Sequence, residues 1–585
     1  MITEDKRIIN PILSKPIQIV FGLPNEPFKT GEWVSIDTEW FKMDKKVMHR
    51  PHTGKFACIT VCPQSEPNTV YIMRNENDVP TLIPYINDAV WVMSNAKFDL
   101  THMRRLAHIP PRKKLYDIQI MEEILYGGYY DMFGLKDTVR RYLHLELDKD
   151  LQKSFDVEVM SEEQIEYACI DAWVTLHTAL EQKKTVRPED FNVWKEIELP
   201  VLWAVLDFQG ARIDIDGWIS LSVSHKRKSE ALDETLPFNP HSPKQVVAWL
   251  KEHGFKNMPD SNEKTIAKFM RKFPNSEAAK ISPTILESRG LRKLASTYGK
   301  SFIEGHIERD EQFNCDVLFT DYKIRGARDT GRFSSANPNL QNVPARETPV
   351  FRQQFIARPG NKIITADYGQ QEPRISAFFS QDKAFIAALS DTKNDIYINM
   401  VKSMWHIDIN KHDPKRKLAK NALLGISYGM SEKGFSDKYG ISKEETAEIF
   451  RSFFNAFPDY ATWLQRQSHI RSSVTTRNGC KLWLNPYSYQ AERNARNAPI
   501  QGTAAEMMKK AISEIHQNWK TKEWNYPFAI VLQVHDEIVL DVPETIAKEV
   551  AAFVQEKMVS VAEKMCPGVP FIASISIGDS WAEKE

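Results

Sequence analysis

Residues 361–376, NKIITADYGQQEPRIS, decide the fold of this chain. The apolar run at the start of this stretch predicts a short buried strand that ends by presenting Asp367. Glu372 and Arg374 follow almost at once. A carboxylate at the end of a buried strand is unfavourable unless a cation meets it, and a divalent metal ion is an efficient partner. We therefore take Asp367 as a candidate metal ligand.

A second stretch, VLQVHDEIVLDVP at 531–543, repeats this device. Two β-branched apolar runs flank the triplet His535, Asp536 and Glu537, which predicts a hairpin with a charged tip. If this hairpin lies beside the strand that ends at Asp367, then Asp367 and Asp536 face each other across a space that two divalent ions can fill. Metal ions roughly 3.5–4 Å apart suit in-line displacement at phosphorus. Our working hypothesis is a nucleotidyl transferase.

Bulk composition excludes several classes of protein. At 585 residues the chain is too long for one core, so we expect two to four domains. No apolar run approaches the roughly 20 residues of a membrane span, and the first residues lack the apolar core of a signal peptide. The 6 cysteines are scattered without a CxxC pair, so neither a zinc site nor a disulfide framework is indicated. We expect a reducing, cytoplasmic setting and no membrane contact.

Net charge is zero, with 77 basic and 77 acidic residues, yet the basic residues are clustered. Local positive stripes, rather than net charge, form the electrostatic footprint of a protein that binds a phosphate backbone. Solvated helix faces explain any single cluster equally well. The three clusters are Lys323, Arg325, Arg328, Arg332 and Arg346; Lys415, Arg416, Lys417 and Lys420; and Arg493 and Arg496.

Acidic residues from three segments stand out before residue 190. Asp37 and Glu39 lie two apart on a predicted strand and hence on one face. Asp99 follows in SNAKFD. The segment SEEQIEYACIDAW predicts a helix that starts with a capping box, and its Tyr167 and Asp171 project from one face.

These acids fit two-metal hydrolysis of a phosphodiester, in which Asp37, Glu39, Asp99 and Asp171 hold the ions and Tyr167 orients the attacking water. The ordered series Asp-x-Glu, Asn-x3-Asp and Tyr-x3-Asp resembles the DEDDy 3′–5′ exonucleases. The resemblance implies a ribonuclease-H-like sheet with surrounding helices and a site for single-stranded 3′ ends. The alternative is a set of unrelated surface acids.

The middle of the chain predicts a connection and a helical arm. KKTVRPED at 183–190 predicts a linker, and long amphipathic helices after it predict an arm with a basic end, although an ordinary helical subdomain fits equally well. DTGRFSSANPNLQNVPAR at 329–346 has many amide, hydroxyl and guanidinium donors, which can follow a nucleic-acid backbone without demanding a sequence. Arg332 is our candidate for contact near a primer end.

A basic helix follows Asp413, which predicts an N-cap, and Pro414, which predicts a first helical position. Positive charge in a first turn opposes the helix dipole, so this helix start is expected to receive a polyphosphate. One face offers cations, then an apolar surface, then a ring: Arg416, Lys420, Leu424 and Tyr428. Further on, the same spacing aligns Arg493, Asn497 and Gln501, which we expect to touch the template strand and the nascent base pair.

Together these segments resemble the DNA polymerase I family (family A), and with the exonuclease series the resemblance covers almost the whole chain. The matching residues are Asp367, Tyr368, Gln370, Glu372 and Arg374 for motif A; Arg416, Lys420, Tyr428 and Gly429 for motif B; His535, Asp536 and Glu537 for motif C; and the signature TGRxSSxxPNLQNxP from Thr330 to Pro344, which contains Arg332 and Asn342.

The family resemblance implies roles for these residues. Two Mg²⁺ ions, which Mn²⁺ can replace, would be bound by Asp367 and Asp536, with Glu537 in the catalytic set. The incoming triphosphate would be held by Arg416 and Lys420, with Lys420 a candidate proton donor to pyrophosphate. Nucleotide contacts are implied for Tyr368, Gln370, Glu372, Leu424 and Tyr428, with Glu372 crowding the sugar 2′ position. DNA contacts are implied for Arg332, Asn342, Arg493, Asn497, Gln501 and His535.

The implied fold is α/β (α+β): a ribonuclease-H-like exonuclease domain followed by a right-hand polymerase domain with palm, fingers and thumb. We expect the exonuclease domain at 1–190 and the polymerase domain at 191–585. Within the latter we expect the thumb at about 206–300, the palm at about 301–384 and 506–585, and the fingers at about 385–505. Two departures from the family pattern are Leu424, where an aromatic residue is usual, and Tyr397, where a histidine is common.

We therefore expect a monomeric DNA-templated DNA polymerase with 3′–5′ proofreading that uses primer-template DNA and dNTPs. The family's 5′-nuclease domain is expected to be absent, as in the compact bacteriophage replicative members. One alternative is a single-chain RNA polymerase, against which Glu372 argues. The other is a non-catalytic primer-template-binding homologue, against which the intact carboxylates argue.

Overall fold

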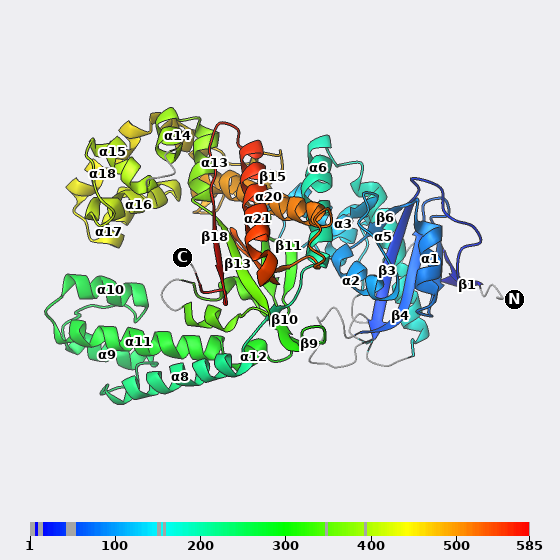
Figure 1. Ribbon diagram of the computed structural model, residues 1–585, viewed down its shortest axis with the longest axis horizontal. Helices are drawn as coiled ribbons and strands as arrows, with labels where there is room; N and C mark the ends of the chain where they lie inside the picture. Colours follow the sequence, from blue (N-terminus) through cyan, green and yellow to red (C-terminus); the bar gives the residue numbers. More distant parts are fainter. Residues whose placement is uncertain are drawn as a thin grey trace.

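The computed structural model describes residues 6–9, 16–41, 54–148, 154–155, 159–345, 349–390 and 395–583. Arg346 of the first basic cluster lies outside these ranges. The N-terminal α/β part lies at one end of the molecule and a strand-rich centre follows it (Figure 1). Two helical groups lie at the other end of the molecule, one above the other in the view of Figure 1.

The N-terminal part is built on a seven-stranded mixed sheet in the order β1-β2-β5-β4-β3-β6-β7. Strand β3, an inner strand of this sheet, runs antiparallel to β4 and parallel to β6. The strands are β1 Lys6–Ile9, β2 Ile17–Phe21, β3 Trp33–Phe41, β4 Lys55–Pro63, β5 Thr69–Met73, β6 Val90–Met93 and β7 Leu115–Asp117. The helices are α1 Asp78–Ile86, α2 Ala96–Leu106, α3 Ile118–Tyr126, α4 Leu135–Leu143 and α5 Glu162–Gln182.

Helix α5 starts as the sequence predicts. Ser161 Oγ accepts from the Gln164 amide at 3.3 Å, and Gln164 Oε1 accepts from the Ser161 amide at 2.8 Å, which completes the capping box. The predicted linker at 183–190 is only a short turn, because a helical segment begins at Pro188. This helical segment comprises α6 Pro188–Val193, a π-helical turn Trp194–Glu198 and α7 Leu199–Leu206. Leu202 of this segment belongs to one continuous core that also contains Ile36 and Ile364, so the two parts of the chain are packed together rather than loosely tethered.

The centre of the C-terminal part is a four-stranded antiparallel sheet in the order β16-β17-β13-β18. The long helices α20 and α21 pack against each other, and α21 packs on β13 and β18. These strands are β13 Asn361–Tyr368, β16 Ile530–Val534, β17 Glu537–Pro543 and β18 Ala573–Gly578, and the helices are α20 Ala491–Trp519 and α21 Ala547–Met565.

Two helical groups flank this sheet in Figure 1. The first is the arm α8 Ile215–Glu234, α9 Pro243–Glu252, α10 Glu263–Lys272, α11 Glu277–Thr297 and α12 Lys300–Ile303. The second contains α13 Gln371–Ser380, α14 Lys383–Ser390, α15 Ile396–Trp405, α16 Pro414–Ser427, α17 Glu432–Tyr439, α18 Lys443–Ala456 and α19 Pro458–Ser468.

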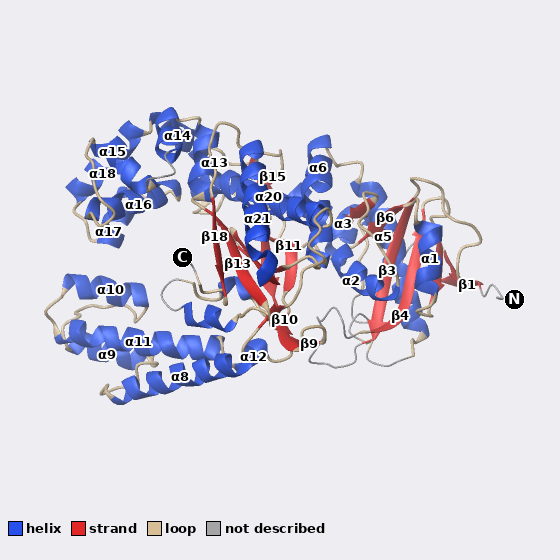
Figure 2. Ribbon diagram, viewed as in Figure 1, coloured by secondary structure: helices blue, strands red, loops and turns tan. Residues whose placement is uncertain are grey.

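Short strands and 3₁₀ turns connect these bodies. A three-stranded sheet contains β8 Ala211–Arg212, β9 Ile307–Asp310 and β10 Cys315–Leu318, and the two hairpins are β11 Asp321–Ala327 with β12 Arg332–Ala336, and β14 Ser473–Thr475 with β15 Lys481–Trp483. The 3₁₀ turns are Leu340–Asn342, Pro349–Gln354 and Glu544–Ile546. Strands and helices are mixed in the two sheet-bearing parts, while the flanking groups are helical (Figure 2). The predicted α/β architecture is confirmed.

Within the described ranges, no helix combines the length and apolar character that crossing a membrane requires. All six cysteines are free thiols with buried side chains.

Two candidate active sites

The N-terminal sheet carries a compact acidic cluster. Asp37 and Glu39 share one face of β3, and Asp171 meets them from α5, which packs on β3 and β4. One carboxylate oxygen from each lies within 4.8 Å of the others. Three carboxylates this close repel one another unless a cation lies among them, and hard oxygen donors are what divalent cations prefer. The donor set therefore fits a divalent metal ion.

Tyr167 lies one helical turn before Asp171 and belongs to the same site. Burial raises the pKa of its phenol far above the usual value, and the negative charge of Asp171 and Glu39 raises it further. The hydroxyl therefore stays protonated and keeps a hydrogen to donate at neutral pH. The predicted pairing of Tyr167 with Asp171 on one helix face is confirmed.

Asp99 of α2 is bound differently from the other three acids. Its Oδ1 accepts from the Thr38 amide at 3.1 Å and from Thr38 Oγ1 at 2.6 Å. Burial raises the pKa of Asp99 to about 7, although these two bonds lower it. Among the described residues, the close acidic cluster contains three of the four predicted ligands and not Asp99, so its role as a ligand stays a prediction.

The second site forms where β13 meets the hairpin of β16 and β17. The register pairs Asp367 with Glu537, and the Tyr368 amide donates to the Asp536 carbonyl at 3.1 Å. Val534 pairs with Glu537, which leaves His535 and Asp536 as a two-residue turn. The predicted hairpin and its position beside the first strand are confirmed. Burial raises the pKa of Asp536, while nearby Arg332 opposes that rise.

Glu537 contacts buried partners behind the hairpin tip. Its Oε2 accepts from Arg352 at 3.3 Å, and its Oε1 accepts from the indole of Trp581. The Arg352 guanidinium lies 3.9 Å from the centre of the Trp581 ring. The C-terminal segment thus fixes the hairpin from behind, and this places Glu537 in a supporting position rather than at the exposed tip.

A buried polar network also supports the hairpin, and the sequence reasoning missed it. Gln533 Nε2 donates to the His535 carbonyl at 2.8 Å, and Gln341 Nε2 donates to Gln533 Oε1 at 2.9 Å. The backbone N–H of Gln533 donates to the Tyr322 hydroxyl at 2.9 Å. The one available signal was a glutamine inside an otherwise apolar strand, since a buried amide needs partners.

Glu372 joins three segments next to these acids. Its Oε1 accepts from Arg332 of β12 at 2.5 Å, and its Oε2 accepts from the hydroxyl of Tyr428, which caps α16. Burial and the charge of Glu372 raise the pKa of Tyr428 to about 12. Glu372 and Tyr428, both predicted to contact the nucleotide, are thus bonded to each other, and Arg332 lies beside both.

Of the predicted nucleotide contacts, Tyr368 instead serves the local fold, whereas the role of Gln370 stays a prediction. Tyr368 is 2% exposed, and its hydroxyl donates to the Met558 carbonyl of α21 at 2.8 Å, so its ring points into the core. Gln370 has a positive φ of 51° and accepts from Arg374 at 3.3 Å. Arg374 is buried and donates to the carbonyls of Gly369 and Leu389. The strict strand alternation around Asp367 explains why Tyr368 faces the opposite side.

The basic face of α16 starts at the predicted residues. Asp413 accepts from the Lys415 amide at 2.8 Å, and Pro414 is the first helical residue. The Arg416 guanidinium pairs with Asp395, with Nε to Oδ2 at 3.1 Å. The Tyr397 ring lies 5.6 Å from the Arg416 guanidinium and 5.7 Å from Lys420 Nζ. Further along this face Leu424 is 38% exposed.

The predicted DNA-contacting side chains differ in placement. The Arg493 guanidinium lies 5.9 Å from the Tyr428 ring, and Gln501 hydrogen-bonds the Tyr428 hydroxyl. Asn497 is half-buried on the same helix, whereas His535 and Asn342 are exposed.

One residue of the first basic cluster is misassigned. Arg325 is buried and pairs with Glu198 at 2.6 Å, and Lys509 pairs with the same carboxylate at 2.8 Å. Arg325 therefore neutralises a buried acid and contributes nothing to a phosphate-binding surface.

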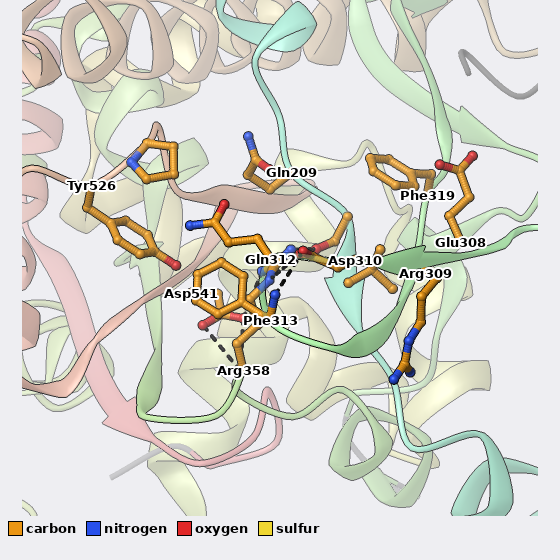
Figure 3. A pocket seen from close by; sticks show the side chains of 13 residues that line it. Gln209, Glu308, Arg309, Asp310, Gln312, Phe313, Phe319, Arg358, Tyr526 and Asp541 are labelled. Atoms are coloured by element: carbon orange, nitrogen blue, oxygen red, sulfur yellow. Dashed lines mark hydrogen bonds and ion pairs between the residues drawn. The ribbon is translucent and has the colours of Figure 1, made fainter.

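A polar cavity of about 180 Å³ lies outside both acidic clusters (Figure 3). The Arg358 side chain lines this cavity and donates to Asp310 at 3.0 Å and to Asp541 at 2.9 Å. Its second terminal nitrogen donates to the Gly210 carbonyl at 2.8 Å. These bonds join β9, β17 and the residue just before β8, so the charged groups of this cavity hold the three-stranded sheet against the four-stranded one.

The fold and the two acidic sites define a polymerase-type palm joined to a nuclease-type α/β domain. Family models agree: residues 221–583 match DNA polymerase family A, and residues 25–186 match the 3′–5′ exonuclease domain. The chain belongs to DNA polymerase family A and carries a 3′–5′ exonuclease domain.

Relatives and a solved structure are consistent with this assignment. The chain is 29% identical to DNA polymerase I of Chloroflexus aurantiacus and 30% identical to that of Pseudomonas aeruginosa, over 73% and 74% of its length. It spans 47% and 49% of those two proteins, about half their length. A structure of the POL domain of Pol1 from M. smegmatis, in complex with DNA primer-template and dNTP, matches with a TM-score of 0.79 at 22% identity. That match covers 94% of this chain and 96% of the other and shows a shared fold.

Proposed function

We propose that this chain is a DNA-templated DNA polymerase that adds dNTPs to a primer 3′ end and proofreads with its 3′–5′ exonuclease. The observation that carries the proposal is the strand pairing that sets Asp367 beside the Asp536 turn, with the Glu372–Tyr428 contact next to it. Family membership supports it, as does the neighbouring structure with primer-template and dNTP. The viral replication setting suggested by the sequence stays a prediction, because the relatives compared are bacterial.

In this proposal each acidic site holds divalent cations, with Mg²⁺ as the expected ion and Mn²⁺ as a substitute. Asp367 and Asp536 would hold them in the polymerase site, and Asp37, Glu39 and Asp171 in the exonuclease site. When bound, the ions supply Lewis-acid stabilisation of the charge that develops around phosphorus. Arg352 and Trp581 hold Glu537 behind the turn, so we assign Glu537 a positioning role instead of a direct catalytic one.

The α16 face would bind the incoming triphosphate. Arg416 would exchange its partner Asp395 for a phosphate, and Lys420 would donate a proton to the leaving pyrophosphate. The aromatic ring of Tyr397, which lies near both cations, would line the same path. The pair with Asp395 and a contact to phosphate are both charge-assisted, so the greater negative charge of the triphosphate would drive this exchange.

Glu372 would select the sugar. Arg332 and Tyr428 fix both of its oxygens, so its carboxylate cannot turn aside to admit a 2′-hydroxyl. A ribonucleotide would meet steric crowding and an acceptor that already has its donors. Discrimination between sugars then depends on this contact rather than on the metal site.

At the other site, Tyr167 would orient the attacking water beside the acidic cluster. Arg493, Asn497, Gln501, His535 and Asn342 would contact primer-template DNA. We keep the division into an exonuclease domain at 1–190 and a polymerase domain at 191–585, with thumb, palm and fingers at the boundaries given above.

Primer extension tests this function. The wild-type chain with Mg²⁺ and dNTPs should extend a labelled primer along its template, and rNTPs should be used far less efficiently. Asp367→Asn keeps the size of the side chain and should abolish extension. Binding of primer-template without extension, in either Mg²⁺ or Mn²⁺, would show a non-catalytic homologue, and equal use of rNTPs would favour the RNA polymerase alternative.

A further inference from the structure

The loop between β15 and α20 presents two tyrosine rings to solvent. Tyr487 is 96% exposed and Tyr489 is 94% exposed. The loop is nonetheless ordered by its own hydrogen bonds: Asn485 Oδ1 accepts from the Tyr487 amide at 3.0 Å, and Ser488 Oγ accepts from the Gln490 amide at 3.1 Å. Two large rings this exposed within three residues contribute little to the core, which points to a role in binding.

One end of this loop is anchored on the exonuclease domain. Trp483 Nε1 donates to the Leu125 carbonyl at 2.8 Å, and its ring lies 5.2 Å from that of Tyr129. Gly128 has a φ of +85°, and a Cβ there would lie 2.3 Å from the Trp483 carbonyl oxygen. This contact therefore requires glycine, and it fixes the start of the loop against the exonuclease domain.

The other end leads into the nucleotide-binding face. Arg493 lies four residues after Tyr489, and its guanidinium is 5.9 Å from the Tyr428 ring. The loop thus spans from the exonuclease domain to the proposed polymerase site, and both exposed rings lie between the two anchors.

The charge around the loop is positive. Lys481 Nζ lies 3.5 Å above the Trp483 ring, and Arg493 and Arg496 follow on α20. Glu492, in the first turn of α20, pairs with Arg471 at 3.4 Å. Exposed aromatic rings beside basic side chains are the features by which proteins bind single-stranded nucleic acid without regard to sequence.

We propose that Tyr487 and Tyr489 form a stacking platform for the unpaired template bases that are about to enter the polymerase site. The inference rests on the proposed function. The template is the strand that reaches a polymerase site unpaired, and only unpaired bases offer free faces to a ring. Continuity with Arg493 and Tyr428 places the platform at the edge of the proposed nucleotide site, where such bases would arrive.

The test compares two double variants. Tyr487→Ala with Tyr489→Ala removes both rings, whereas Tyr487→Phe with Tyr489→Phe keeps the stacking surface and removes only the hydroxyls. Equilibrium binding is measured by fluorescence anisotropy on two primer-templates, one with a template overhang of one nucleotide and one with a long overhang. Neither variant touches the acidic sites, and equal thermal unfolding of the variants confirms that both fold.

Wild type should prefer the long overhang, and the alanine pair should lose about tenfold in affinity for it while binding the short overhang as before. The phenylalanine pair should stay within about twofold of wild type on both. Equal loss on both substrates, or no loss, would overturn the platform. Impaired degradation of single-stranded 3′ ends with unchanged overhang preference would place the primer strand on the loop and overturn the template assignment.

The proposed function is scored separately, by insertion of one nucleotide on the short overhang. If wild type fails that insertion, the polymerase assignment fails, while the anisotropy comparison still shows whether the rings bind an overhang. If wild type inserts normally and the overhang preference does not depend on the rings, only the platform is wrong.

Discussion

The two acidic sites of this molecule are prepared in different ways. In the exonuclease domain, one carboxylate oxygen from each of Asp37, Glu39 and Asp171 lies within 4.8 Å of the others. In the polymerase domain three predicted site residues are paired with oppositely charged side chains: Glu372 with Arg332, Glu537 with Arg352, and Arg416 with Asp395.

The difference indicates what each site must do before chemistry. Under the proposed function, the exonuclease cluster would need only cations and a strand end, because three of its acids already lie close together. The polymerase site would require an exchange of partners, since Arg416 would leave Asp395 to bind a phosphate. In that proposal, the polymerase site rearranges only when a nucleotide binds, whereas the acidic cluster of the exonuclease domain needs no such rearrangement.

The largest expected effect separates the two sites. Asp536→Asn should reduce primer extension by about a thousandfold or more, because it removes a charged ligand from the polymerase site alone. Degradation of a labelled single strand should stay within about twofold of wild type. Both rates are measured on the same preparation, and loss of both would contradict separate sites.

The reciprocal change acts on the preassembled cluster. Asp37→Ala with Glu39→Ala should reduce degradation of single-stranded 3′ ends by about a hundredfold or more, since two of three converging ligands are removed. Extension of a matched primer should be unaffected, and the error rate of copying should rise. Unchanged degradation would remove the exonuclease assignment from these residues.

A smaller effect concerns selectivity rather than rate. Glu372→Ala should raise the use of rNTPs relative to dNTPs by about tenfold to a hundredfold, because a pocket that rejects one group by crowding loses that barrier. The ratio of kcat/KM values for the two sugars measures it. Tyr428→Phe is the matched control: it removes the hydroxyl that Glu372 accepts from and keeps the ring, so a smaller shift in the same direction is expected. An unaltered ratio in Glu372→Ala would withdraw the sugar-selection role.

The smallest expected effect is a pH dependence at Asp99. Its pKa is about 7 in the folded chain against an ordinary value of 3.8, so the folded state holds the proton more tightly. Stability from this group is present at low pH and is lost as pH rises from about 4 through 7. Asp99→Asn should therefore raise the Tm relative to wild type by a few degrees more at pH 8 than at pH 5.

Thermal unfolding in the presence of EDTA measures this difference, because chelation removes any contribution of bound metal. A difference between variant and wild type that does not change with pH would mean that Asp99 is already ionised at pH 5.

Local patterns predicted much of the fold and of both sites. The strand that carries Asp367, the hairpin turn at Asp536, the capping box of α5 and the start of α16 at Pro414 all follow from spacing, turn chemistry and caps, which act over a few residues. The acidic cluster of the exonuclease domain followed from the same patterns and from the family resemblance.

What the sequence did not reveal depends on packing between distant segments. Arg325 counts as a surface cation until Glu198, more than a hundred positions away, is known to be buried beside it. Trp581 fixes Glu537 only once the C-terminal segment returns along the sheet. Tyr368 turns inward because its neighbour Asp367 faces out, and Asp99 bonds to Thr38 because α2 lies against the edge of β3.

One measurement tests most directly the claim that two separate sites act in turn on the same primer end. Matched and mismatched primers are prepared with either an ordinary or a phosphorothioate last linkage, which resists hydrolysis, and are extended with Mg²⁺ and dNTPs. The account predicts that both matched primers are extended, while the mismatched primer is extended only when its last linkage can be cut. Equal extension of the two mismatched primers, or no extension of any primer, would contradict it.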